Sequence, residues 1–202
     1  MAVAAKKGSS SKSTYTLTST TLADVVKEID KKGPVDPNES TRYSGKCLGR
    51  LDLTLGPADL DLVVTPGTTP VEVVARLKGG SVTTSCEITL PKLASANKLS
   101  AAAKKEWERF AGAVEKHEDG HADAYFDEAK KLAAELDAVS ATATGATEKA
   151  AKAAAAKALL DMLKARYGGS TLNDRMKAVA KAYDAKTKHG ASQGATLDGS
   201  IA

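Results

Sequence analysis

The sequence predicts an α+β fold, in which a small, mainly antiparallel sheet with one short helix is followed by three helices. Two observations carry this prediction. Residues 51–90 contain several short runs in which apolar and polar side chains alternate, as they do in half-buried strands. Residues 100–186 instead contain long runs with apolar side chains every three or four positions, broken by glycine or small residues, as in amphipathic helices.

The N-terminal half begins with a strand signal and one capped helix. Tyr15-Thr-Leu-Thr has the composition of a strand, and Thr20 or Thr21 caps the helix, which ends at Gly33-Pro34. Gly79-Gly80 is a hairpin turn signal between the last two strands, so we expect those strands to pair. The strand signals after the helix fall in residues 42–55, 59–65, 71–77 and 81–90.

The C-terminal half carries three helix signals. Ser100 caps the first, whose apolar positions continue to Leu136, and the small, Thr-rich residues 138–145 are expected to form a loop. The second helix is alanine-rich and covers residues 147–167, where Gly168-Gly169 ends it. The third begins at Ser170 or Thr171 and ends near Lys186.

The domain boundaries follow from composition. Residues 1–13 are rich in Lys and Ser and are expected to form a disordered lead-in. Residues 196–202 are expected to form a loose tail. Residues 14–195 are expected to form a single domain, with residues 14–91 as its sheet-rich part and residues 99–190 as its helical part.

Composition also excludes several classes of protein. Hydrophobic residues make up 42% of the 202 positions but aromatic residues only 4%, which suits helices packed through alanine. The net charge of +4 is modest and the lysines are scattered among helical carboxylates, so we expect no nucleic-acid partner. No run of 18 apolar residues is present, so we expect no membrane span.

The motif with the most specific chemistry is His117-Glu118-x-x-His121, inside the first C-terminal helix. Side chains four residues apart share one face of a helix, so both imidazoles can point at one metal ion. Glu118 stands beside them, where it can accept a proton from water at the metal. Two of the three histidines of the chain are in this motif. The pattern predicts a zinc site with Glu118 as the general base.

The two histidines continue an apolar stripe along the helix. Trp107, Phe110, Val114, His117 and His121 follow one another at steps of three or four residues. We therefore expect the motif to face the packed side of the helix, and the metal site to form between this helix and another element.

A catalytic zinc ion normally has three protein ligands, so the third must come from elsewhere. Asp127 lies on the same helix, but Ala124 does not bend the helix toward it, and Glu148 stands alone at the start of the next helix. The preferred third ligand is His189, the only other histidine, with Asp184 as the fallback.

Several segments of the chain resemble the DUF922 family of bacterial proteins, described as predicted secreted zinc-dependent proteases. The resemblance implies that His117 and His121 are metal ligands and Glu118 the general base, and it favours His189 as the third ligand. The matching segments are Thr-Leu-Ala-Asp-Val-Val with Lys-Lys-Gly33-Pro34, Cys86 to Leu90-Pro91, Trp107 to His121, and Tyr183-Asp184-x-x-Thr187-x-His189-Gly190-x-x-Gln193-Gly194.

The predicted function is that of a zinc-dependent hydrolase, a metallopeptidase acting on a peptide or protein substrate. Glu118 accepts the proton of the attacking water, and Tyr183 or the backbone amide of Gly190 stabilises the oxyanion. Two alternatives stay open. One is a non-catalytic module that binds a peptide or protein and keeps a vestigial or structural metal site, and the other is a secreted effector protease.

The cysteines and the N-terminus bear on where the protein acts. Cys47 and Cys86 are expected to form either one disulfide or two free buried thiols. The resembling family is usually exported, but Met1-Lys7 and the Ser-rich run after it lack the apolar stretch of a signal peptide. We therefore expect a cytoplasmic protein or one that is delivered by another route.

Overall fold

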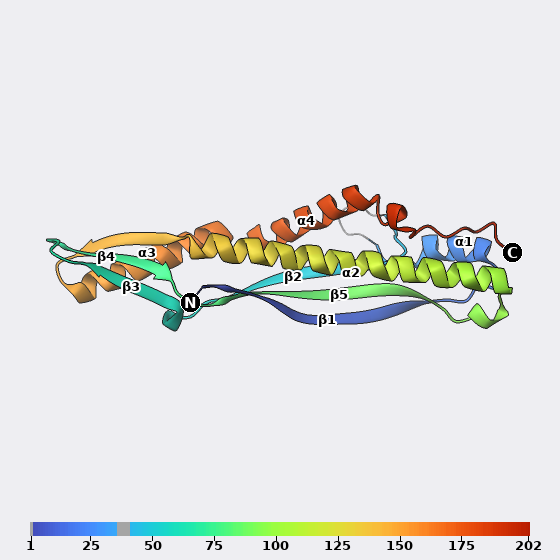
Figure 1. Cartoon of the computed structure of the whole chain (residues 1–202), viewed down its shortest axis with the longest axis horizontal. Helices are drawn as coiled ribbons and strands as arrows, with labels where there is room; N and C mark the ends of the chain where they lie inside the picture. Colours follow the sequence, from blue (N-terminus) through green and yellow to red (C-terminus); the bar gives the residue numbers. More distant parts are fainter. Residues whose placement is uncertain (1, 36–40) are drawn as a thin grey trace. The chain divides into compact units, whose positions relative to one another are not determined.

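The computed structural model describes residues 2–35 and 41–202, and its mixed helices and strands confirm the predicted α+β class (Figure 1). The helices are α1 (Leu22–Lys32), α2 (Ala101–Asp137), α3 (Glu148–Tyr167) and α4 (Thr171–Thr187). The strands are β1 (Ala4–Leu17), β2 (Lys46–Thr54), β3 (Leu60–Thr65), β4 (Val71–Leu77), β5 (Ser81–Leu93) and β6 (Ser140–Gly145). They form two sheets, with strand orders β1-β5-β2 and β3-β4-β6. None of the helices in the described ranges is long and apolar enough to cross a membrane.

The chain divides into two compact units, each built from three separate segments and each containing both strands and helix. The predicted division into a sheet-rich part and a helical part therefore does not coincide with the units. Unit 1 contains the described residues of Met1–Gly8, Arg50–Thr84 and Phe126–Lys177, and unit 2 those of Ser9–Gly49, Ser85–Tyr125 and Ala178–Ala202.

In unit 1, α3 packs on the sheet β3-β4-β6. Both strand pairs are antiparallel, with Leu60 opposite Leu77 and Arg76 opposite Ser140. The prediction of a loop over residues 138–145 is wrong, because β6 occupies most of that range. The alanines of β6 lie on its more buried side and the threonines on its exposed side. Alanine thus takes the inward positions that larger apolar residues take in other strands.

In unit 2, α1 and the first part of α2 share one hydrophobic core. Thr21 caps α1, as predicted, with its side chain accepting a hydrogen bond from the backbone N–H of Asp24. Phe110 and Val114 of α2 are each only 1% exposed, so the apolar stripe predicted from the sequence is the packed face of the helix. The core residues are Leu17, Leu22, Val25, Ile29, Leu93, Ala103, Trp107, Phe110 and Val114.

Both predicted loose ends are ordered. Residues 4–13 belong to β1, so the disordered lead-in is a wrong prediction from Ala4 onward. The run is polar because β1 is an edge strand, where exposed lysine and serine side chains are common. In unit 2, Lys12 on this strand forms ion pairs with Glu115 and Asp119 of α2.

The C-terminal tail is held against α2 by hydrogen bonds. Arg109 donates to the carbonyl oxygens of Gly194 and Thr196, each at 2.7 Å, and Glu106 accepts from the backbone N–H of Asp198 at 2.9 Å. Leu197 and Ile201 pack against the core of unit 2. The prediction of a loose tail over residues 196–202 is therefore wrong, since polar anchors and apolar contacts both fix it.

Candidate metal centre

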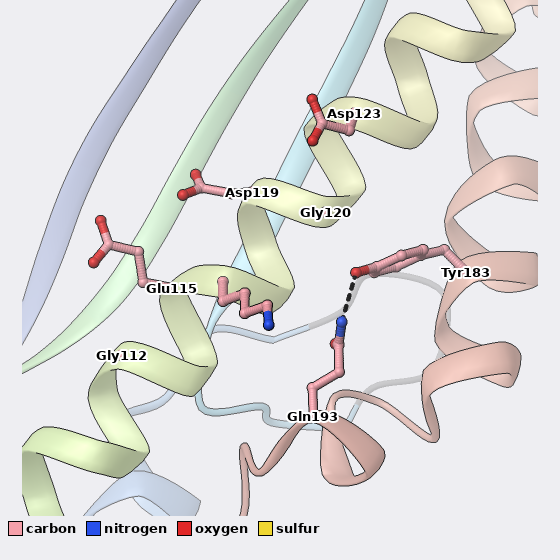
Figure 2. A pocket seen from close by; sticks show the side chains of 8 residues that line it. Gly112, Glu115, Asp119, Gly120, Asp123, Tyr183 and Gln193 are labelled. Atoms are coloured by element: carbon pink, nitrogen blue, oxygen red, sulfur yellow. Dashed lines mark hydrogen bonds between the residues drawn. The ribbon is translucent and has the colours of Figure 1, made fainter.

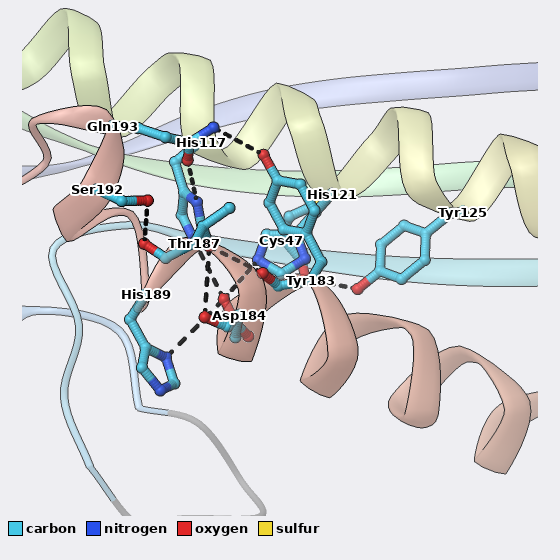
Figure 3. Close-up of polar contacts among 10 residues, drawn as sticks. All are labelled: Cys47, His117, His121, Tyr125, Tyr183, Asp184, Thr187, His189, Ser192 and Gln193. Carbon is cyan, nitrogen blue, oxygen red and sulfur yellow. Dashed lines mark hydrogen bonds and ion pairs between the residues drawn. The ribbon is translucent and has the colours of Figure 1, made fainter.

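The functional groups of unit 2 converge where α2 meets the C-terminal half of α4. His117, His121 and Asp184 each offer one ligand atom, and these atoms lie within 4.8 Å of one another. Oδ1 of Asp184 lies 3.2 Å from Nε2 of His117 and 3.0 Å from Nε2 of His121 (Figure 3). The helical spacing of the two histidines and the position of Asp184 on α4 thus place three donors around one point.

These three side chains fit a divalent transition metal. Imidazole and carboxylate are both ligands that zinc accepts, and ligand atoms of a tetrahedral zinc ion lie about 3.3 Å apart. The two separations from Asp184 to the histidines, 3.2 and 3.0 Å, are close to that value, and all three ligand atoms lie within 4.8 Å of one another. His117 and His121 are 6% and 5% exposed, and Nδ1 of His121 is buried without a hydrogen-bond partner in the described part of the chain. Two buried imidazoles that face one carboxylate thus form a donor set of the kind that would hold a divalent ion.

Asp184 and the histidines of the centre shift one another's pKa values. Burial would raise the pKa of Asp184, but hydrogen bonds with His117 and His121 outweigh burial and hold that pKa well below its usual range. For His117, burial lowers the pKa, yet the hydrogen bonds with Asp184 and Gln193 prevail and raise it. Asp184 is therefore a carboxylate anion, which is the form that binds a metal.

Glu118 lies beside the three donors as a buried acid. Glu118 is only 3% exposed, and burial raises the pKa of its carboxyl group to about 7. The backbone of Gly45, just before β2, packs against it, because a Cβ added at Gly45 would lie 2.6 Å from Oε1 of Glu118. A carboxyl group with a pKa near neutrality can both accept and return a proton, which is the requirement for a general base.

Tyr183 covers the two histidines from α4. Its ring stacks on His117 with a centroid distance of 5.3 Å and meets the edge of His121 at 4.6 Å. Its hydroxyl group lies against Gly120 of α2, where a Cβ atom would overlap it. The sequence prediction that Tyr183 belongs to the centre therefore agrees with its position.

Gln193 was not predicted to have a role, although the structure brings it into the centre. It lies in the 3₁₀ turn η3 (Ala191–Gln193), and its Oε1 is 2.9 Å from Nδ1 of His117. Its Nε2 donates to the hydroxyl of Tyr183 at 3.1 Å. Gln193 does belong to the segment from Tyr183 to Gly194 that resembles the family. Gly190 and Gly194 on either side of it adopt the left-handed conformation, which folds the turn back toward α2.

His189, the predicted third ligand, is not one of the three converging residues, and Asp184 takes that place. Lys188 and His189 have φ values of 52° and 51°, in the left-handed region, so the chain turns sharply after α4. The imidazole of His189 stacks on Tyr43 at 5.2 Å, and its side chain is 47% exposed. Its Nδ1 lies 3.8 Å from Oδ1 of Asp184, so His189 contacts the ligand from outside.

The other ligand candidates are surface residues. Asp127 pairs with Lys130 at 2.8 Å and its side chain is 65% exposed. Glu148 pairs with Lys152 at 2.5 Å in the first turn of α3. Both carboxylates thus have ordinary helical ion-pair partners one turn away.

The two cysteines are free and buried, which resolves the alternatives that the sequence left open. The hydrogen bond with Cys86 and burial both raise the pKa of the Cys47 thiol. The backbone carbonyl of Cys47 accepts a hydrogen bond from Tyr125 of α2 at 3.4 Å. The two thiols therefore contact each other between the neighbouring strands β2 and β5.

A cavity of about 450 Å³ opens along α2 beside the centre. Gly112, Gly120, Tyr183 and Gln193 are among the residues that line it. Figure 2 shows the side chains of Tyr183 and Gln193 pointing toward each other at this cavity. His117, Glu118, His121 and Asp184 are not among the lining residues, so Tyr183 and Gln193 lie between the cavity and the histidines.

Comparison with known proteins gives one match. A family model described as "Bacterial protein of unknown function (DUF922)" matches residues 12–190. No curated protein and no solved structure matches the chain. The matched range contains His117, Glu118, His121, Tyr183 and Asp184.

Proposed function

The chain is a member of the DUF922 family of bacterial proteins, and on that premise we propose that it is a metal-dependent hydrolase, specifically a zinc peptidase. The observation that carries the proposal is the position of the buried Glu118 carboxyl group beside three converging ligands, His117, His121 and Asp184. Three protein ligands leave one position of a tetrahedral ion for water or substrate, which is typical of catalytic zinc sites.

Each residue has a role that its chemistry supports. A bound zinc ion supplies Lewis acidity, which polarises a substrate carbonyl group and makes water more acidic. His117 and His121 hold the ion through neutral nitrogen atoms, and Asp184 adds a negative charge. Glu118 takes the proton from the attacking water and returns it to the leaving amine, because its pKa is near 7.

Tyr183 is the group best placed to stabilise negative charge on the substrate. Its hydroxyl group lines the cavity beside the histidines, and a phenol O–H can donate to an oxyanion. The substrate is a peptide or protein, because hydrolysis of an amide bond uses this combination of Lewis acid, general base and oxyanion donor.

The proposal is tested by metal content and peptide cleavage together. Wild type and Glu118→Gln are purified without chelators, and zinc is measured by elemental analysis. We expect about one zinc ion per chain in both proteins. Cleavage of a mixed pool of quenched fluorescent peptides should be lost in Glu118→Gln only, since the amide cannot accept a proton.

Glu108→Gln is the matched control, because Glu108 is an exposed carboxylate on the same helix and does not line the cavity. It should keep both zinc and activity. A wild type that binds no zinc would overturn the proposal. Stoichiometric zinc without cleavage of any peptide would instead support the non-catalytic binding module.

A further inference from the structure

We propose that Gln193 is a positioning residue of the metal centre, which sets the tautomer of His117 and the hydrogen-bonding direction of Tyr183 at the same time. The inference rests on the proposed function, since it assigns a role around the same metal ion. It concerns a residue of η3, beyond the ligands and the general base.

The contact with His117 decides which ring nitrogen binds the metal. Oε1 of Gln193 is an acceptor only, and it lies 2.9 Å from Nδ1 of His117. Nδ1 therefore donates to Gln193, which leaves Nε2 as the nitrogen that would bind the metal ion. Without the ion, Nε2 donates to Oδ1 of Asp184, 3.2 Å away. An acceptor behind a metal-binding imidazole also makes the ring a stronger ligand.

The contact with Tyr183 uses the other end of the same amide. Nε2 of Gln193 donates to the hydroxyl oxygen of Tyr183 at 3.1 Å. With Oε1 committed to His117, the NH₂ group can only donate here, so the hydroxyl accepts. The phenolic hydrogen stays available for a second partner, and the hydroxyl lines the cavity. Gln193 thus leaves Tyr183 as a hydrogen-bond donor toward a substrate.

The segment that carries Gln193 is braced at both ends. Gly190 packs against the His117 ring, since a Cβ there would lie 3.1 Å from its Cγ atom. The backbone N–H of Gln193 donates to the carbonyl of Gly190 at 2.9 Å. Arg109 then fixes the carbonyl of Gly194 to α2. The backbone on both sides of Gln193 is therefore fixed by contacts within the protein.

Two substitutions separate the two contacts. Gln193→Ala removes both. Gln193→Glu keeps an acceptor for Nδ1 of His117 but has no N–H for Tyr183, so the tyrosine hydroxyl must donate to the carboxylate. Zinc affinity is measured by competition with a chromophoric chelator, and the Co²⁺ form is examined by absorption spectroscopy.

We expect Gln193→Ala to weaken zinc binding by about 10–100-fold, as loss of an outer-shell partner does. Gln193→Glu should bind zinc at least as tightly as wild type, and its Co²⁺ spectrum should match. Its peptide cleavage should nevertheless fall to the level of Tyr183→Phe, because in both proteins the phenolic donor is lost. Thr196→Ala, on the same tail, is the control and should match wild type in affinity and turnover.

Unchanged zinc affinity in Gln193→Ala would overturn the inference, as would an equal loss in Gln193→Ala and Gln193→Glu. Thermal unfolding of the zinc-free proteins shows that each variant is folded. If wild type binds zinc but the zinc affinities of the two Gln193 variants differ from these expectations, the role assigned to Gln193 is wrong and the proposed function stands. If wild type itself binds no zinc, the proposed function fails.

Discussion

The hydroxyl group of Tyr183 lies against the Cα atom of Gly120, at a place on α2 where no side chain fits. A glycine inside a helix costs about 1 kcal/mol relative to alanine, so its presence calls for a structural reason. The close approach of Tyr183 supplies one. Because Gly120 has no side chain, the hydroxyl of Tyr183 can reach Gln193 while the tyrosine ring stacks on His117.

Gly120→Ala should therefore destabilise the protein by about 1–3 kcal/mol, because the new methyl group overlaps the Tyr183 hydroxyl. Gly112→Ala is the matched control on the same helix, since a Cβ there meets no atom within 4 Å. It should stabilise the protein by up to about 1 kcal/mol. Chemical denaturation measures both free energies of unfolding, and equal effects at the two positions would contradict this account.

Asp184 and His189 should differ sharply in their contribution to metal binding. Asp184→Ala removes one of three converging donors, and we expect zinc affinity to fall by about 100-fold or more. His189→Ala removes a half-exposed imidazole that stacks on Tyr43, and affinity should change by no more than about threefold. Isothermal titration with zinc distinguishes the two. The reverse order would restore His189 as the third ligand.

Glu106 should contribute stability that is lost in acid. The hydrogen bond from Arg109 lowers the pKa of Glu106 to about 2 in the folded protein, whereas a glutamate in the unfolded chain has its ordinary pKa of 4.5. Its contribution is thus fully present above pH 4.5 and disappears as the pH falls toward 2.

Glu106→Gln should accordingly lose about 1–3 kcal/mol of unfolding free energy at pH 7, and the difference from wild type should shrink below about pH 4. Glu108→Gln removes the same charge from an exposed position of α2 and should have little effect. Urea unfolding between pH 2.5 and 7 measures the profile. A pH-independent difference would show that Glu106 acts through packing alone.

The two thiols should be unreactive in the folded protein. Cys47 and Cys86 are 9% and 7% exposed, and the pKa of the Cys47 thiol is raised by its contact with Cys86 and by burial. A thiolate is the reactive form, so Ellman's reagent at pH 8 should react about 100-fold or more slowly with native protein than with unfolded protein. Two thiols should react after denaturation in guanidinium chloride. A rapid native reaction would contradict the burial.

Much of the fold could be predicted because it depends on local periodicity. The stripe from Trp107 to His121 is set by helical spacing, and its burial follows from the apolar residues within it. The part of β1 before Tyr15 and the whole of β6 were missed for a physical reason. A polar edge strand such as β1, and a strand of alternating Ala and Thr such as β6, are stabilised by pairing with neighbours and carry little apolar signal of their own.

The site shows the same limit. The pairing of His117 and His121 on one helix face could be predicted from spacing alone, whereas the side chain that joins them depends on how the chain turns after α4. Scarcity of histidine favoured His189, but left-handed backbone at Lys188 and His189 directs that ring to Tyr43 and leaves Asp184, one helical turn earlier, facing the histidines. Gln193 depends on the same turn, which no periodic pattern encodes.

The discontinuous course of the chain has a consequence for how the protein is made. The segment Phe126–Lys177, which belongs to unit 1, separates the two histidines from Asp184 and Gln193 of unit 2. His121 and Asp184 are 63 positions apart. During synthesis the ribosome must therefore release the whole intervening segment before the donors can meet. A nascent chain that ends before Asp184 therefore lacks one of the three converging side chains.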